Sequence, residues 1–211
     1  MNDARRLRPL VATLCLLAAG GAHASDTDAL RAAAAALEDK TVAWRHDFHR
    51  HPELSHQEER TAGVVAAHLE SLGMAVDTGI AGHGVRGVLE GGRPGPVVAL
   101  RADMDALPVT EQTGLPYAST VRTVFNGQET GVMHACGHDA HVAILMATAE
   151  LLAGRRESLA GTIVFIFQPA EESMDSGARN MLAAGLFDEL RPDAIFGLHV
   201  GSNLPSGIVG L

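Results

Sequence analysis

The sequence predicts an α/β fold in which helices flank a largely parallel β-sheet. Apolar runs of strand length alternate along the chain with segments of helical period, which is the pattern of such folds. The clearest strands are expected at residues 97–100, 161–167 and 194–198. Their continuous apolar character is typical of strands that are covered on both faces. Hydrophobic residues make up 46% of the 211-residue chain, which is enough for a sizeable core.

Four segments have the pattern of helices: residues 25–51, 57–72, 140–152 and 176–184. The first is rich in alanine, and Asp26 or Asp28 could cap its start. A glycine lies within two residues of the end of each of the others, which is a common stop signal. Near the end of the first helix lie His46, His49 and His51, and we expect them on a solvated helix face.

Shorter elements fill the gaps between these segments. Two strands are expected at residues 74–77 and 85–89, on either side of a glycine-rich turn, and another is expected to begin at Ile208. Residues 107–131 have no clear period, so we expect a long loop over the site. Long loops inside compact domains are often functional.

The composition excludes some classes of partner. The formal net charge is −9 at pH 7, which argues against a nucleic-acid partner, because phosphate binding needs clustered Lys and Arg. The chain has one Tyr and one Trp, so it offers no aromatic platform on which bases could stack. No segment after the N-terminal region is long and apolar enough to suggest a membrane span.

The N-terminus has the three parts of an export signal. Basic residues among the first eight precede an apolar core at residues 10–19, which is too short for a stable membrane anchor. An Ala-x-Ala pattern at residues 22–24 follows. We therefore expect residues 1–24 to be a signal peptide and residues 25–211 to be periplasmic or secreted. An N-terminal helix of the fold is the alternative, and the choice between the general and the twin-arginine export route stays open.

Removal of that signal would leave a single cysteine. Cys15 would be lost with the signal peptide, and Cys136 would remain. An intramolecular disulfide is then impossible, and a lone thiol in an oxidising compartment needs burial or coordination.

Residues 134–141 concentrate the side chains that bind metals, because a thiol, three imidazoles and a carboxylate fall within this stretch. Cys136 and His138 offer a soft thiolate and a borderline imidazole, a pair suited to zinc, cobalt or manganese-type ions. Gly137 lets the backbone bend so that both side chains can face one point. A buried cysteine beside a surface histidine is the alternative, but the neighbouring histidines and aspartate favour a metal site.

Further candidates lie at or just beyond the ends of three apolar strands, where open α/β sheets carry their sites. They are Asp103, Asp105, Glu171, Glu172 and His199. Hydrolysis at a metal needs one carboxylate on the cation and another free to take a proton from water, which Glu171 and Glu172 could provide. Asp103 and Asp105 point the same way on an extended backbone, and one of them can approach the metal or orient a ligand histidine. The alternatives are a solvated acidic turn, a helix cap and a structural histidine.

Together and in this order, the motifs resemble those of the hippurate hydrolase and indole-acetyl-amino-acid hydrolase group of metal-dependent amidohydrolases. That group is related to the aminoacylases and the glutamate carboxypeptidases. The resemblance covers nearly all of the chain from about Leu37 onward. The matching stretches are residues 45–55, 99–109, 133–141, 167–172 and 197–200.

The resemblance implies a centre of two divalent metal ions, zinc or manganese, with Cys136 as a bridging thiolate. It implies His138, Glu172 and His199 as further ligands. Glu171 would be the general base that activates the bridging water, and Asp105 the supporting carboxylate. The implied reaction is hydrolysis of the amide bond of N-acyl amino acids, with hippurate-like substrates.

The family pattern also implies parts that this chain does not match. Family members are about twice as long, with an inserted lid and dimerisation domain and a later histidine ligand, so the full-length form is expected to be a homodimer through the lid. We expect the catalytic domain to be incomplete and residues 25–211 alone to bind metal weakly and to hydrolyse no N-acyl amino acid at a measurable rate. The alternatives are a non-catalytic metal-binding remnant and an exopeptidase of the same superfamily. The pair of Cys136 and His138 favours the amidohydrolase branch, because the peptidase branches commonly use aspartate at the bridging place.

Overall fold

The computed structural model describes residues 21–210, with only the backbone described for residues 21–25. The chain divides into two compact units, residues 1–36 and residues 37–211. In the first unit, helix α1 (Gly21–Ala35) has exposed side chains throughout its described part. Because α1 begins before Asp26 and Asp28, the expectation that either caps this helix was wrong. Most of the expected signal peptide lies outside the described residues.

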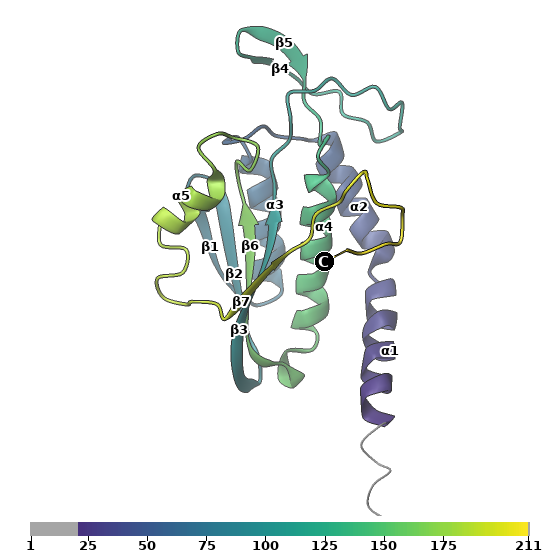
Figure 1. Cartoon of the computed structure of the whole chain (residues 1–211), viewed down its shortest axis with the longest axis vertical. Coiled ribbons are helices and arrows are strands. Elements are labelled where there is room, and N and C mark those ends of the chain that lie inside the picture. The colour runs from purple at the N-terminus through teal and green to yellow at the C-terminus, as the bar shows by residue number, and fades with distance from the viewer. Residues whose placement is uncertain (1–20, 211) are drawn as a thin grey trace, which may run out of the picture. The chain divides into compact units, whose positions relative to one another are not determined.

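A five-stranded sheet forms the centre of the second unit, in the order β1-β2-β6-β3-β7 (Figure 1). The strands are β1 (Ala75–Ile80), β2 (Gly84–Glu90), β3 (Arg93–Asp103), β6 (Ala160–Gln168) and β7 (Ala194–Gly197). β3 runs parallel to both β6 and β7, whereas β2 is antiparallel to β1 and to β6. The predicted α/β fold is confirmed, and the parallel part of this mixed sheet holds the three strands that precede the candidate residues.

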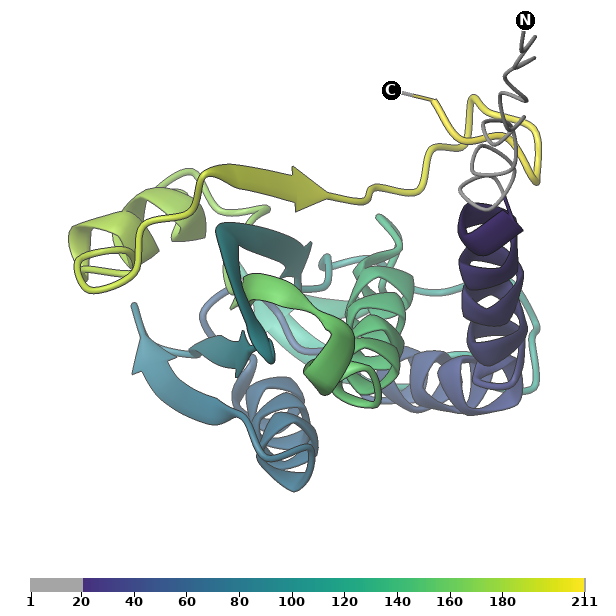
Figure 2. The ribbon, with the colours of Figure 1, turned by 90° about the horizontal axis from the view of Figure 1, so that it is seen from below.

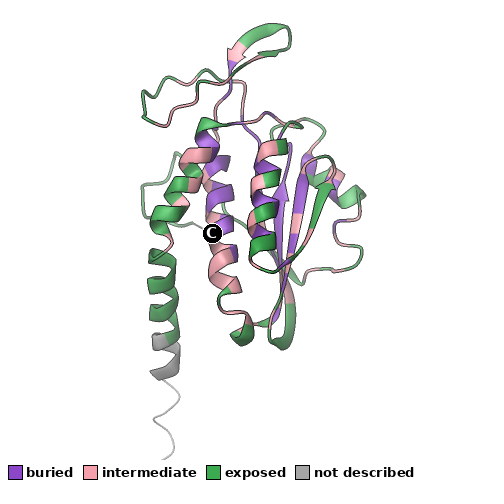
Figure 3. Cartoon of the chain, turned by 180° about the vertical axis from the view of Figure 1, so that it is seen from behind, coloured by how far each residue is buried: buried purple, intermediate pink, exposed green. Residues whose placement is uncertain are grey.

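Helices cover both faces of this sheet (Figure 2). On one face lie α2 (Glu38–Arg50), α3 (Glu59–Ser71) and α4 (His138–Ala153), with α5 (Gly177–Ala183) on the other. β6 is buried on both faces: Phe165 and Phe167 pack toward the larger group of helices, and Val164 and Ile166 toward α5. This alternation follows from the period-2 side-chain geometry of strands, and the purple faces of α4 and β6 mark the resulting core (Figure 3).

Three sequence expectations need correction. The expected helix at residues 25–51 is interrupted by a turn at Ala36 and Leu37, which separates α1 from α2. The expected loop at residues 107–131 contains a hairpin, β4 (Arg122–Phe125) and β5 (Gln128–Gly131). Its turn is Asn126-Gly127, both with positive φ, which is the strongest short-range hairpin signal in a sequence. Residues 208–210 form no strand.

A short helix, η1 (Arg156–Ser158), joins α4 to β6. Among the described helices, none combines the length and the hydropathy that a membrane span requires.

Candidate metal centre

The parallel strands bring the candidate residues to one edge of the sheet. Asp103 pairs with Gln168, and Arg101 with Gly197, so β3, β6 and β7 end side by side. Asp105, Glu171 and Glu172, and His199 each follow one of these ends, as expected for open α/β sheets. α4 starts at His138 beside them, and its N-cap, Gly137, has φ 88°.

Gly137 is needed at this bend for two reasons. Its positive φ strains any residue that carries a Cβ atom. A Cβ atom at this position would also lie 2.4 Å from Cγ2 of Val200. The chain can therefore turn from Cys136 into α4 close to the segment that carries His199.

The candidate ligands come together. Coordinating atoms of Cys136, His138 and Glu172 all lie within 4.8 Å of one another. Sγ of Cys136 is 3.6 Å from Nε2 of His199. Nε2 of His138 is 3.8 Å from a carboxylate oxygen of Glu171 and 3.8 Å from one of Glu172. A thiol, two imidazoles and two carboxylates thus face one point.

His138 has the surroundings of a ligand. Its side chain is fully buried; Nδ1 lies 3.3 Å from a carboxylate oxygen of Asp105, whereas Nε2 has no hydrogen-bond partner among the described residues. A buried polar atom without a hydrogen-bond partner lowers the stability of the folded state. Burial alone would lower the pKa of His138, but Asp105, Asp103 and Glu172 raise it. A divalent cation at Nε2 would provide the missing partner, so the residues present fit a metal ion.

Asp105 supports the centre from its buried side. One oxygen accepts the Ser55 hydroxyl at 2.6 Å and the backbone N–H of Glu172 at 2.9 Å. Burial would raise the pKa of Asp105, but hydrogen bonds from His138, Ser55 and the glutamate backbone lower it to about 2. The ionised carboxylate therefore connects α4, β3 and the turn after β6.

The turn after β6 carries the two glutamates. Ala170 has φ 52°, an uncommon conformation for a non-glycine residue. Its backbone N–H donates to the buried carboxylate of Glu58 at 2.7 Å. Burial raises the pKa of Glu58. Glu58 thus holds the bend that precedes Glu171 and Glu172, a role that the sequence analysis missed.

The surroundings of Cys136 disfavour its thiolate form. Burial, together with Glu172, Glu171 and Asp103, raises the pKa of its thiol to about 11. A bound divalent cation inverts this effect, because a coordinating thiol is deprotonated. Metal binding at this place would therefore release a proton.

A second buried network lies beside the centre and corrects one expectation. His49 is only 4% exposed, so it does not lie on a solvated helix face. Its Nδ1 is 2.8 Å from Asp139, and its Nε2 is 3.1 Å from Glu111. Asp139 also accepts from Arg45 at 3.3 Å. The hydrogen bond with Asp139 raises the pKa of His49 despite its burial.

The network also anchors the loop before β4. The carboxylate of Glu111 accepts the backbone N–H of Ser119 at 2.6 Å and the hydroxyl of Thr113. Tyr117 stacks on His46, with ring centroids 3.7 Å apart. This loop is thereby fixed over α2.

His134 is the other histidine whose surroundings the sequence did not reveal. It is 4% exposed, and neither of its ring nitrogens has a hydrogen-bond partner among the described residues. Burial lowers its pKa to about 4, so it is uncharged at neutral pH. It lines a cavity of about 680 Å³ whose wall also includes Cys136, His199, Arg45 and Tyr117.

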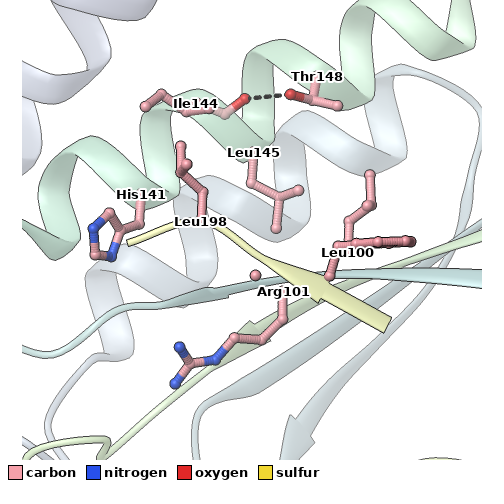
Figure 4. A pocket seen from close by; sticks show the side chains of 9 residues that line it. Leu100, Arg101, His141, Ile144, Leu145, Thr148 and Leu198 are labelled. Atoms are coloured by element: carbon pink, nitrogen blue, oxygen red, sulfur yellow. Dashed lines mark hydrogen bonds between the residues drawn. The ribbon is translucent and has the colours of Figure 1, made fainter. Parts of the chain in front are cut away.

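A smaller cavity of about 330 Å³ lies between α4 and the β3–β7 edge. Its wall is mainly apolar, with Leu100, Ile144, Leu145 and Leu198 (Figure 4). His141 lies at one end of it, next to the segment after β7. Because the larger cavity reaches Cys136 and His199, it is the better candidate for a substrate site.

Comparison with known proteins shows the family of this chain. The model of peptidase family M20/M25/M40 matches residues 99–211. The chain belongs to this family. An N-acetylcysteine deacetylase from Bacillus subtilis is 45% identical over 177 residues, which are 83% of this chain and 44% of the relative. Thermostable carboxypeptidase 1 from Saccharolobus solfataricus is 44% identical over 174 residues, covering 82% and 42%.

A solved relative is described as metal-binding. The crystal structure of the Bacillus subtilis YXEP protein, described as a dinuclear metal binding peptidase of the M20 family, is 44% identical, with a TM-score of 0.71. The match covers 81% of this chain and 45% of that structure. The chain spans less than half of the length of these relatives. Membership of a hydrolase family and the mixed α/β fold are therefore established for the matched part.

Proposed function

We propose that the full-length form of this protein hydrolyses the amide bond of N-acyl amino acids at a centre of two divalent metal ions, zinc or manganese. The ligands are Cys136, His138, Glu172 and His199. The convergence of these side chains around a fully buried imidazole, whose Nε2 has no hydrogen-bond partner among the described residues, carries the proposal. Two bound ions would polarise the scissile carbonyl and lower the pKa of water.

Glu171 is the proposed general base. Its side chain is 39% exposed, and its carboxylate has no hydrogen-bond partner within the described residues. It therefore stays accessible to water while its oxygen lies 3.8 Å from His138. Glu172 is less exposed, at 24%, and its backbone is held by Asp105, which suits a ligand better than a base.

The acyl group or the amino acid would occupy the cavity beside Cys136 and His199. Its volume of about 680 Å³ lies within the range of small-molecule sites, roughly 300–1,000 Å³. The charges on its wall are largely compensated, because Arg45 and His49 contact Asp139 and Glu111. Leu115, Tyr117 and Met133 add apolar surface. A neutral, partly apolar lining suits an acyl group.

Exopeptidase activity is the second candidate, because a carboxypeptidase is among the relatives at 44% identity. Both reactions cleave an amide bond next to an amino acid. A substrate panel separates them.

The native protein, isolated with its mass measured, is assayed for release of free amino acid from N-acetyl and N-benzoyl amino acids and from dipeptides. The proposal expects turnover of N-acyl amino acids that ceases with a chelator and returns with zinc or manganese. Turnover of dipeptides alone would favour the exopeptidase. Turnover that is insensitive to chelation would contradict the metal centre. A Cys136→Ser variant serves as the matched loss-of-ligand control.

A further inference from the structure

His141 is bound on both sides of its ring. It lies in the first turn of α4 and is 2% exposed. Its Nδ1 is 2.6 Å from an oxygen of Asp103, at the end of β3. Its Nε2 is 2.9 Å from the backbone nitrogen of Val200. The ring thus joins the centre of the sheet to the segment that follows β7.

These two contacts fix the position of the ring proton. A backbone N–H can only donate, so Nε2 of His141 accepts the hydrogen bond from Val200. The proton then lies on Nδ1 and is donated to Asp103. The second oxygen of Asp103 accepts from Arg101 at 2.7 Å, and Arg101 donates to Gln168 at 2.9 Å. A continuous chain of hydrogen bonds therefore runs from the end of β6 to Val200.

Val200 is also held by His199. Nδ1 of His199 donates to the carbonyl oxygen of Val200 at 2.7 Å, which leaves Nε2 facing Sγ of Cys136. The pairing of β7 with β3 ends at Gly197, so sheet hydrogen bonds do not orient the residues beyond it. The contact from His141 provides a fixed point in this exposed segment.

We propose that His141 is a positioning residue that holds the Val200 backbone, and through it directs Nε2 of His199 toward the metal centre. This inference rests on the proposed metal centre. A second set of possible ligands exists, because coordinating atoms of Asp103, His138, His141 and His199 also lie within 4.8 Å of one another. The positioning role of His141 argues against that set. In that set, both nitrogens of His141 and both oxygens of Asp103 are already used by hydrogen bonds. Outer partners of metal ligands commonly fix the orientation of the ligand ring in this way.

Two substitutions at this position separate positioning from ligation. In His141→Gln, the amide oxygen can accept from Val200 and the amide nitrogen can donate to Asp103. In His141→Phe, both hydrogen bonds are lost. A positioning role predicts that Gln keeps the metal affinity close to that of the parent chain. It also predicts that Phe weakens binding of one of the two ions by roughly 10–100-fold, the usual effect of removing an outer partner.

Metal affinity is measured on the full chain by titration with Co²⁺, followed by the thiolate-to-cobalt charge-transfer absorption of Cys136 and by calorimetry. His68→Gln is the matched control, because His68 is also hydrogen-bonded through one ring nitrogen, at 3.1 Å to Met146, but lies on α3. Equal losses in His141→Gln and His141→Phe would identify a ligand and overturn the proposal. Unchanged affinity in both would overturn it as well.

Nitrogen-15 NMR of the metal-free full chain tests the hydrogen-bond roles directly, without depending on the metal. The expected spectrum has the His141 proton on Nδ1, with Nε2 coupled across the hydrogen bond to the amide nitrogen of Val200. A proton on Nε2 would overturn the inference. If the parent chain binds no divalent ion while NMR finds the proton on Nδ1, the proposed metal centre fails and the hydrogen-bond chain stands. Asp103→Asn adds a further test. The NH2 group of the asparagine would replace one acceptor oxygen and would face a donor, either Nδ1 of His141 or the Arg101 guanidinium. The nitrogen-15 signal of His141 Nδ1 should therefore broaden or shift.

Discussion

A carboxylate oxygen of Asp105 lies 3.3 Å from Nδ1 of His138, and both side chains are completely buried. The opposite ring nitrogen of His138 faces Glu171 and Glu172. A carboxylate behind a histidine orients the ring and increases its basicity toward a metal on the far side. The contact with Asp105 therefore orients Nε2 of His138 toward the proposed metal centre.

Asp105→Asn should weaken metal binding by roughly 10–100-fold, because the amide cannot support His138 as the carboxylate does. It should also destabilise the fold by about 1–3 kcal/mol, since the hydrogen bonds from Ser55 and the Glu172 backbone would lose a charged acceptor. Calorimetric metal titration and urea unfolding measure the two effects. Asp77→Asn, in the exposed part of β1, is the control. Full metal affinity in Asp105→Asn would contradict the supporting role.

In the full-length form of the protein, Glu171→Gln should keep the metal content and lose the proposed base. The expected loss of turnover is about a hundredfold or more. Metal analysis of the variant separates this outcome from loss of the centre, and Asp175→Asn in the same exposed turn is the matched control. Near-normal hydrolysis in Glu171→Gln would assign the base to another residue.

Cys136 should be protected from alkylation when metal is bound. Coordination removes the thiolate from reaction, and its pKa of about 11 in the metal-free chain makes labelling slow until the pH is raised. Iodoacetamide labelling near pH 9, followed by mass spectrometry, is compared with and without chelator. Labelling at the same rate in both would identify an ordinary thiol.

The stability that His49 contributes should depend on pH. Its pKa is raised above the ordinary value of 6.5 by Asp139 and Glu111. The contribution is therefore complete below pH 6.5 and is lost as the pH rises through the raised folded-state value. Unfolding free energies of the parent chain and His49→Gln are compared between pH 5.5 and 9. The gap, about 1–3 kcal/mol at the acid end, should narrow toward pH 9.

His68 provides a control of opposite sign for this experiment. Burial lowers its pKa below 6.5, so folding disfavours its charged form. The parent chain should lose stability relative to His68→Gln as the pH falls below 6.5. A gap for His49→Gln that is constant with pH would mean that the pKa of His49 is the same in the folded and unfolded states.

Export remains a prediction from the sequence. If residues 1–24 are a signal peptide, N-terminal sequencing of the exported protein should begin at Ser25. The periplasmic fraction and the culture medium are the samples to analyse. An intact Met1 in those fractions would contradict the prediction.

The sequence by itself determined the fold class and the identity of the candidate ligands. Strand length, apolar runs and helical period are local properties, and the three parallel strands were expected within a few residues of their observed positions. A candidate that follows each strand can be placed at the carboxyl edge of the sheet without coordinates, because parallel strands end at the same edge. The hairpin at Asn126-Gly127 also has a local sequence signal, but the sequence analysis did not predict it.

The tertiary structure alone decided what the other buried histidines do. His49 meets partners 62 and 90 residues away in the chain, and His141 meets Asp103 across 38 residues and Val200 across 59. No periodicity encodes such a pairing, because each imidazole can lie on a solvated face, in the core or at a metal until packing fixes its neighbours. The charge and the donor or acceptor role of a histidine follow from those neighbours, and they exist only once α2, α4 and the strand ends are folded together.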